Sequence, residues 1–333
     1  MTDALGRMMD WTQRARWIWS ALGILVLWAA LSIVTSHFSL QSLSGIMATS
    51  SFLVLAALGQ MFVVTSGGGN IDLSIGNVLT LSAYTSLILV DGQNDRLIIG
   101  VGLVLAIGVV VGTANAALVL LFRIPAIIAT LATGYVLATA TLFANKYLTN
   151  SNAAPSLKTI GAGRLGGLPI MMLVALLAVV AVALVLGKLV FGRTLSAVGQ
   201  NRRAAHLAGV KINRVIASAF LISSLLAAID GLLLSAYVGG AFPDMGTPYL
   251  LQSVGAVVLG GSLIMGGAST ALGTLCGSIL LVMIVTTMQI AGLPPGTQDI
   301  VQGVVVIAVL GLAGAKSVRS RVSATSTSSP GAR

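Results

Sequence analysis

Ten long runs of mostly apolar residues constrain this chain more than any other feature of its sequence. As a helix, a run of about 17 to 25 such residues crosses the hydrocarbon core of a bilayer. Because that core offers no water to unpaired backbone groups, each run is expected to be helical. The sequence therefore predicts an all-α polytopic membrane protein with about ten transmembrane helices, at residues 17–35, 43–65, 71–90, 97–121, 124–144, 168–190, 215–236, 250–266, 268–291 and 298–314.

The eighth and ninth runs are joined by a very short connection at Gly266 and Gly267. They are either two full helices or a broken, re-entrant pair. A re-entrant pair is tolerated only where protein or a water-filled cavity satisfies the backbone. The sequence leaves both alternatives open.

The composition excludes several classes of protein. Hydrophobic residues make up 56% of the chain and charged residues only 8%. The net charge of +10 comes from cations in tails and short loops, so no basic domain is available to bind nucleic acid. The single Cys276 lies in an apolar run, and His37 and His206 are far apart in the sequence. We therefore expect no disulfide, metal centre, cofactor or enzyme active site.

The distribution of Lys and Arg predicts the orientation of the spans, because short cytoplasmic loops are enriched in these residues. With the N-terminus inside, the inner segments hold fourteen cations and the outer loops hold four. This predicts cytoplasmic N- and C-termini. Residues 1–16 become a cytoplasmic tail, 17–314 the membrane domain and 315–333 a disordered cytoplasmic tail, with the longest cytoplasmic loop at 188–214.

That loop carries six cations and no acid. Within it, Asn201 can cap a short helix and Gly209 can end it. The apolar side of this helix would consist of Ala204, Ala205, Leu207 and Ala208. A helix of about two turns is marginal alone and needs a surface on which to dock. The residues by themselves favour the alternative, a solvated basic loop.

The segment that joins the second and third spans reads TSGGGNIDLSIGN, from Thr65 to Asn77. Its glycines permit backbone turns that other residues resist, which suits a broken helix near the inner leaflet. The alternative is a plain cytoplasmic turn, with Asp72 or Ser74 capping the next helix.

Several polar residues lie in or beside the apolar runs. Asp230 is the only ionisable group well inside a predicted span, and such a group is a functional candidate by default. The alternative is a protonated or hydrogen-bonded Asp230 packed against Ser223, Ser224 or a neighbouring helix. Neutral groups could line a path for a hydroxylated solute or bond helix to helix. The pathway candidates are Gln60, Asp72, Asn77, Asn115, Asp230, Gln252 and Gln289.

Two pairs of glycines four residues apart form small-residue faces on predicted helices. They are Gly108 with Gly112 and Gly273 with Gly277. Such faces allow close approach of helix backbones, and we expect packing within the chain in preference to dimerisation.

Four blocks of sequence, taken in order, resemble the permease subunits of ribose-type ATP-binding-cassette (ABC) sugar importers. They read GGGNIDLSIGN, IPAIIATLAT, GRTLSAVGQNRRAAHLAGV and VGAVVLGGSLIMGGASTALGTLCGSILL. The resemblance covers residues 20–314, and branched-chain amino acid permeases are more distant members of the same superfamily. It implies a type II-like importer permease in the bacterial inner membrane, paired with itself or with a paralogue. It also implies a separate cytoplasmic ATPase and a periplasmic or lipoprotein solute-binding protein.

In such permeases the loop that resembles residues 192–209 is a coupling helix that sits in a cleft of the ATPase. The residues carried over by this resemblance are Gly192, Gly199, Asn201, Arg202, Arg203, Ala204, Ala205 and Gly209. Relatives commonly have an acid just after the Asn, whereas this chain has Arg202 and Arg203. That departure suggests an unusually acidic cleft on the ATPase.

The resulting hypothesis is a permease that imports a monosaccharide or small polyol, while ATP hydrolysis takes place on the partner. With only 5% aromatic residues the chain offers few rings for sugar stacking, so affinity is expected to reside mainly in the binding protein. The alternative is a proton-coupled secondary transporter that uses Asp230.

Overall fold

The computed structural model describes residues 17–35, 40–149, 152–294, 296–305, 307, 308 and 311, and these are helical apart from loops and one short hairpin. The helices are α2 (Ile18–Thr35), α3 (Leu40–Thr65), α4 (Ile75–Val90), α5 (Leu97–Leu120), α6 (Ala126–Asn145), α7 (Pro155–Gly161), α8 (Ile170–Lys188), α9 (Val190–Gln200), α10 (Arg202–Leu207), α11 (Ile212–Val238), α12 (Thr247–Leu259) and α13 (Ala271–Ile290). Strands β1 (Arg164–Leu165) and β2 (Leu168–Pro169) pair antiparallel.

The long helices confirm the prediction of a helical polytopic membrane protein. In the described part of the chain, six helices are long and apolar enough to cross a membrane: α3, α5, α6, α8, α11 and α13. Three further apolar helices, α2, α4 and α12, are shorter by this measure. The tenth predicted span begins in helical residues 296–305, and most of its remainder lies outside the described residues, as do the two predicted tails.

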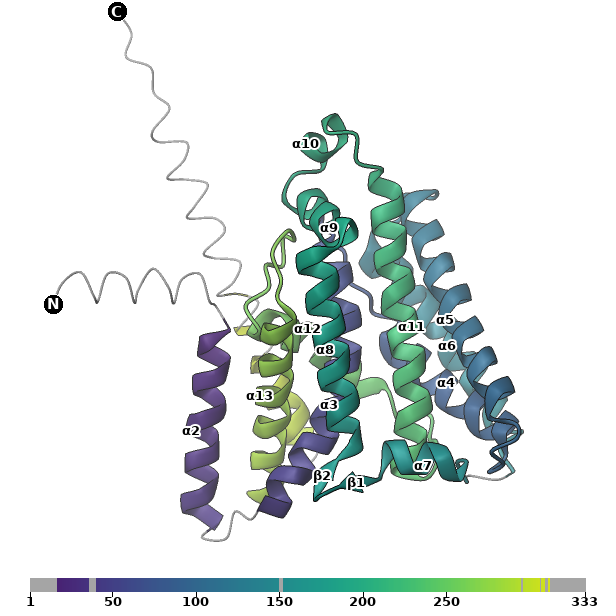
Figure 1. Ribbon diagram of the computed structural model, residues 1–333, viewed down its shortest axis with the longest axis vertical. Coiled ribbons are helices and arrows are strands. Elements are labelled where there is room, and N and C mark those ends of the chain that lie inside the picture. Colours follow the sequence, from purple (N-terminus) through teal and green to yellow (C-terminus); the bar gives the residue numbers. More distant parts are fainter. Residues whose placement is uncertain are drawn as a thin grey trace, which may run out of the picture.

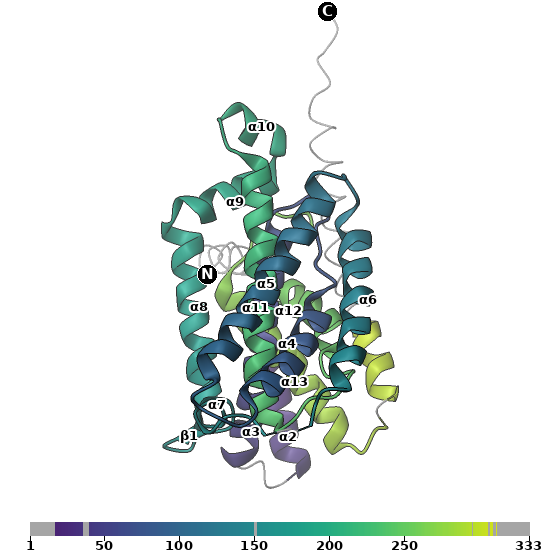
Figure 2. The same ribbon diagram turned by 90° about the vertical axis from the view of Figure 1, so that its right-hand side faces the viewer.

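Helix α11 lies inside the bundle and packs against α3, α4 and α5 (Figures 1 and 2). Close packing depends on the predicted small-residue faces. A Cβ added to Gly112 of α5 would lie 2.7 Å from the Cα atom of Leu221 on α11. Gly277 of α13 meets the backbone of α12 in the same way. Both glycine pairs therefore pack within the chain, as expected.

Two predicted spans are shorter than the apolar runs suggest. The third was predicted at 71–90, but α4 begins only at Ile75. The eighth was predicted at 250–266, but α12 ends at Leu259 and has 13 residues. At about 1.5 Å per residue it is about 20 Å long, against about 30 Å of hydrocarbon.

Glycines explain where α3 and α12 stop. Gly67, Gly68 and Gly69 have φ angles of 70°, 72° and 75°, in the left-handed region that ends a right-handed helix. Gly261, two residues after the last residue of α12, lies in the same region with a φ angle of 84°. The eighth span is thus a half-length helix, and the irregular residues 260–270 separate it from the full-length α13.

The two short helices begin next to each other inside the bundle. Gly246, which precedes α12, donates its N–H to Thr80 Oγ1 of α4 at 2.9 Å. A Cβ on Gly246 would overlap the carbonyl oxygen of Gly76. Since the chain leaves α11 at Val238 and α12 starts against α4, α12 begins in the interior and not at an end of the bundle.

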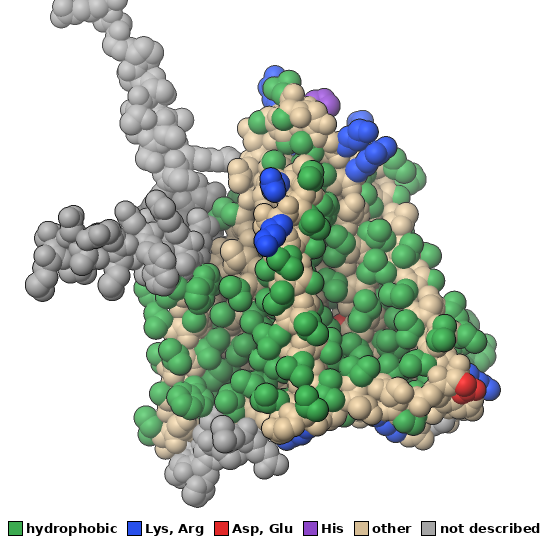
Figure 3. All heavy atoms as spheres, in the orientation of Figure 1, with side chains coloured by type: hydrophobic (Ala, Val, Ile, Leu, Met, Phe, Trp, Pro, Cys, Tyr) green, Lys and Arg blue, Asp and Glu red, His purple; other side chains and the backbone are tan. Residues whose placement is uncertain are grey.

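The two ends of the bundle differ in charge. Figure 3 shows Lys and Arg side chains near both ends of one face, with apolar side chains over the region between them. The end with α9 and α10 carries seven described cations, whereas the end with α7 carries four. The first set is Arg123, Lys188, Arg193, Arg202, Arg203, Lys211 and Arg214, and the second is Arg96, Lys146, Lys158 and Arg164.

Candidate functional site

A buried carboxyl group organises the loop between α3 and α4. Asp72 is fully buried. Its Oδ1 accepts hydrogen bonds from the Ser74 N–H at 3.0 Å and the Ser74 hydroxyl at 2.6 Å. Its Oδ2 accepts one from the Ser223 hydroxyl of α11 at 2.8 Å. Both oxygens are therefore satisfied within the chain, which ties residues 66–74 to the central helix.

Three further helices hold the same loop. Asn115 Nδ2 of α5 donates to Ser74 Oγ at 2.9 Å. Gln60 Oε1 of α3 accepts from the Asp72 N–H at 3.3 Å. Thr130 Oγ1 of α6 accepts from the loop main chain at 2.9 Å. This favours the broken-helix interpretation over a plain turn. We call this set the Asp72 network: Gln60, Asp72, Ser74, Asn115, Thr130 and Ser223.

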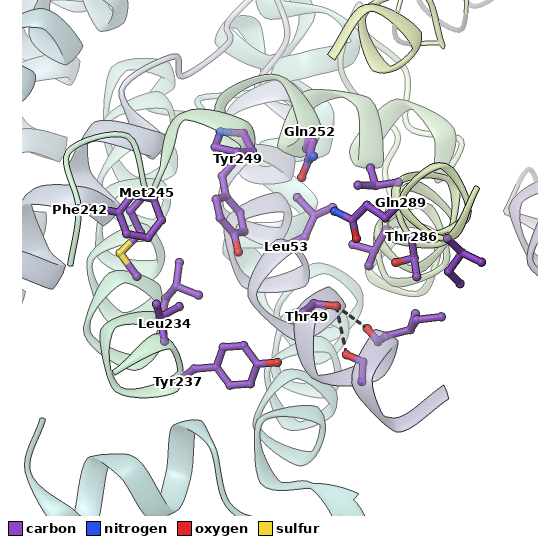
Figure 4. A pocket seen from close by; sticks show the side chains of 17 residues that line it. Thr49, Leu53, Leu234, Tyr237, Phe242, Met245, Tyr249, Gln252, Thr286 and Gln289 are labelled. Carbon is purple, nitrogen blue, oxygen red and sulfur yellow. Dashed lines mark hydrogen bonds between the residues drawn. The ribbon is translucent and has the colours of Figure 1, made fainter. Parts of the chain in front are cut away.

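A cavity of about 590 Å³ lies among α3, α11, α12 and α13. Figure 4 shows the rings of Tyr237 and Tyr249 with their hydroxyl ends in this space, and the amides of Gln252 and Gln289 on its far side. Phe242 adds a third ring. Among the described residues that line it, none is charged; the polar side chains are Thr49, Tyr237, Tyr249, Gln252, Thr286 and Gln289.

The cavity lies in the half of the bundle that is nearer α7. Its walls come from the first part of α3, the last turns of α11 and the last turns of α13, all of which lie toward that end (Figure 1). The first turn of α12 supplies Pro248 and Tyr249. The interior start of this half-length helix therefore forms one wall.

Asp230 lies behind this cavity. It is fully buried, and neither carboxyl oxygen has a hydrogen-bond partner among the described residues. It is one turn before Leu234, a lining residue on the same face of α11. The hydrogen-bonded alternative is not seen among the described residues: Ser223 bonds to Asp72, and the Ser224 hydroxyl has no partner there.

The basic loop forms two short helices at the opposite end. Helix α9 lies across the end of the bundle and α10 projects beyond it (Figures 1 and 2). Asn201 Oδ1 caps α10 by accepting from the Ala204 N–H at 3.0 Å, and Gly209 follows with a φ of 79°. The predicted short helix between Asn201 and Gly209 is confirmed. Ala205 packs into the core, whereas Leu207 is 81% exposed.

Comparison with known proteins decides the family. A family model described as "Branched-chain amino acid transport system / permease component" matches residues 42–310. The chain belongs to this permease family. It is 31% identical to the autoinducer 2 import system permease protein LsrC of Yersinia pseudotuberculosis serotype O:1b over 91% of this chain and 86% of that protein. The LsrC protein of Yersinia pestis strain Pestoides F matches at the same identity and coverage. No solved structure matches this chain.

These findings confirm the resemblance to ABC importer permeases. The permease is a multi-pass inner-membrane protein and a transport component, not an enzyme. Family membership does not favour the proton-coupled alternative.

The pathway residues predicted from the sequence lie in four different places in the permease. Gln252 and Gln289 line the cavity. Gln60, Asp72 and Asn115 meet in the Asp72 network, and all three are fully buried. Asn77 lies against Gly134 of α6, and Asp230 lies behind the cavity wall.

Sequence reasoning missed the two tyrosines of the cavity. Tyr237 falls one residue after the predicted span 215–236, and Tyr249 falls one residue before the span 250–266. A search confined to the apolar runs passes over both. Their position just beyond the run ends is the signal that could have found them, since α11 and α12 extend past those limits.

The glycines of the predicted coupling loop lie at close contacts in the permease. A Cβ on Gly192 would overlap the Val185 carbonyl, so Gly192 permits the tight bend from α8 to α9. A Cβ on Gly199 would overlap the carbonyl oxygen of Thr65. Arg203 is exposed, with no hydrogen bond or ion pair to any described residue, and Arg202 bonds to the Gly67 carbonyl. Arg202 is also exposed, so the expectation that both arginines meet an acidic ATPase cleft stays a prediction.

Proposed function

We propose that this protein is the membrane permease of an ABC importer that carries a monosaccharide or related small polyol inward. The observation that carries the proposal is the pairing of an exposed docking helix, α10, with an uncharged polar cavity in the other half of the bundle. A separate ATPase would act on α10, and a solute-binding protein would deliver substrate at the α7 end. Both termini would be cytoplasmic.

The chemistry of the cavity supports a neutral, hydroxylated substrate. Its amide and hydroxyl groups can both donate to and accept from sugar hydroxyls. Its tyrosine and phenylalanine rings can pack on the apolar faces of a sugar. A volume of about 590 Å³ falls within the roughly 300–1,000 Å³ typical of small-molecule sites. No lining side chain could pair with a charged amino acid.

Transport would require two permease copies, or this chain and a paralogue, around a shared path. ATP binding and hydrolysis would move α10 relative to the membrane helices. The half-length α12 forms a cavity wall, so a shift of this short helix would open the cavity to one side and close it to the other. The relatives are named for autoinducer 2 import, which makes that compound one candidate substrate.

The substrate class is tested by uptake in cells that carry the permease with its ATPase and binding protein. Labelled pentoses, hexoses, small polyols, autoinducer 2 and branched-chain amino acids form the panel. We expect uptake of a neutral hydroxylated solute, reduced by Gln252→Ala and by Gln289→Ala. The control is Gln93→Ala, since Gln93 is exposed in the loop before α5. Uptake of amino acids alone would overturn the proposed substrate.

A further inference from the structure

Three segments far apart in the sequence meet beneath α10. They are the start of the loop after α3, the junction of α9 with α10, and residues 260–270. Gly267 donates its N–H to the Thr65 carbonyl oxygen at 2.9 Å. Gln200 Nε2 at the end of α9 donates to the Gly267 carbonyl oxygen at 3.2 Å. The base of the docking helix is therefore bonded to a loop that follows α12, and that loop is bonded to α3.

Arg202 completes this junction from the docking helix itself. Its Nη2 donates to the Gly67 carbonyl oxygen at 2.9 Å. The guanidinium lies against Gly68, where an added Cβ would be 2.7 Å from Arg202 Cζ. Desolvation lowers the pKa of the Arg202 guanidinium from its ordinary value. The neighbouring Arg203, of the same charge, has no such contact within the described residues.

The segments that meet here lead to the moving parts of the proposed mechanism. Gly67 is five residues before Asp72, whose network holds the start of α4. The loop at 260–270 follows directly from α12, which forms a wall of the cavity. A displacement of α10 would therefore reach α4 and α12 through the hydrogen bonds of Arg202 and Gln200. Among the described residues, Arg202 is the side chain of α10 that hydrogen-bonds to this region.

We propose that Arg202 is a positioning residue that transmits the movement of the docking helix to the loop between α3 and α4. This inference rests on the proposed function and deepens it. Arg202 would act within the permease, and Arg203 with the exposed face of α10 would meet the ATPase. A planar guanidinium with several fixed donors suits this role better than a single flexible ammonium.

The test compares Arg202→Ala with Arg203→Ala in the assembled importer, with ATP hydrolysis and substrate uptake measured in parallel. We expect Arg202→Ala to keep the bound ATPase and its hydrolysis, while uptake per ATP falls about tenfold, within the usual range of coupling factors. Arg203→Ala should keep the wild-type ratio, although it weakens ATPase binding. Arg202→Lys should restore part of the ratio. An unchanged ratio in Arg202→Ala, or loss of ATPase binding as its main effect, would overturn the inference.

A second pair of variants tests the same contact without touching the arginine. Gly68 and Gly69 have nearly equal φ angles, so alanine strains the backbone equally at each. Only Gly68→Ala collides with the guanidinium, because nothing lies near an added Cβ at Gly69. We expect Gly68→Ala to lower uptake per ATP and Gly69→Ala to leave it unchanged. Equal effects of the two would contradict a role for Arg202.

The two pairs of variants distinguish a failure of the inference from a failure of the proposed function. If the wild-type importer shows no ATP-dependent uptake, the proposed function itself fails. If the wild type transports and the Arg202 and Gly68 variants keep its ratio of uptake to hydrolysis, only the inference fails. Combining Gly68→Ala with Arg202→Ala should add nothing to either single change, since both break one contact.

Discussion

Two fully buried aspartates of this permease have opposite surroundings. Asp72 accepts three hydrogen bonds and joins a loop to α11. Asp230 has no hydrogen-bond partner among the described residues. Buried polar groups usually have hydrogen-bond partners. The contacts of Asp72 therefore indicate a structural role, and Asp230 is an exception to the rule. The two aspartates should therefore respond differently to substitution.

The Asp72 network is expected to stabilise the fold through Ser223. Ser223→Ala leaves one carboxyl oxygen without its partner, which should cost about 1–3 kcal/mol. Ser224→Ala is the matched control, because the neighbouring hydroxyl is equally buried and has no hydrogen-bond partner in the described residues. Thermal unfolding in detergent should show a lower midpoint for Ser223→Ala alone. Equal midpoints would show that this bond contributes nothing.

Asp230 is expected to be dispensable for energy coupling. Asp230→Asn keeps the shape of the side chain and removes the proton-carrying group, and no hydrogen bond to a described residue is lost. ATP-dependent uptake should therefore continue, and a protonophore should affect variant and wild type alike. Loss of uptake in the variant, together with transport that needs no ATP, would instead support the proton-coupled mechanism.

At the scale of elements, the sequence predicted the existence of the helices better than their lengths. Apolar runs indicate where a chain can cross a membrane, and α5, α8 and α13 match their runs within three residues at each end. The predicted lengths were wrong at α4 and α12. Helix α4 begins late because the Asp72 network holds residues 72–74 in a loop, and the apolar run of α12 continues past Gly261, where the helix ends. The Asp72 network was also out of reach, since its members come from separate helices.

The short helix α10 could be predicted from its capping residues alone. The cap from Asn201 and the left-handed Gly209 are readable from the sequence. The sequence did not predict which side of α10 faces outward, because that orientation depends on packing against the rest of the chain. The predicted apolar side included Ala205, which the structure buries in the core.

The difference between neighbouring alanines gives a direct test of docking. After Cys276→Ala removes the native thiol, Ala204→Cys should crosslink to the cognate ATPase, because residue 204 is exposed. Ala205→Cys should not, because residue 205 is 5% exposed. Crosslinking is measured in an assembled importer that still transports. No crosslink from position 204 in such a complex would remove α10 as the docking helix.

At the scale of the whole molecule, the two ends of the bundle differ in structure and charge. The basic end carries α9 and α10, and the cavity lies toward α7 (Figure 1). Helices α4 and α12 start side by side, and α12 forms a cavity wall and leads into residues 260–270, which bond to the end of α9. Composition predicted membrane insertion and the resemblance predicted the docking helix. The cavity depends on side chains from four helices, which no single stretch of sequence brings together.

The energy source of transport tests the central claim most directly. Proteoliposomes would contain the permease and its ATPase, with the binding protein outside and a labelled small polyol as substrate. The account predicts uptake that requires enclosed ATP and the binding protein and that persists when a protonophore removes the pH gradient. Uptake driven by a pH gradient without ATP or binding protein would contradict it.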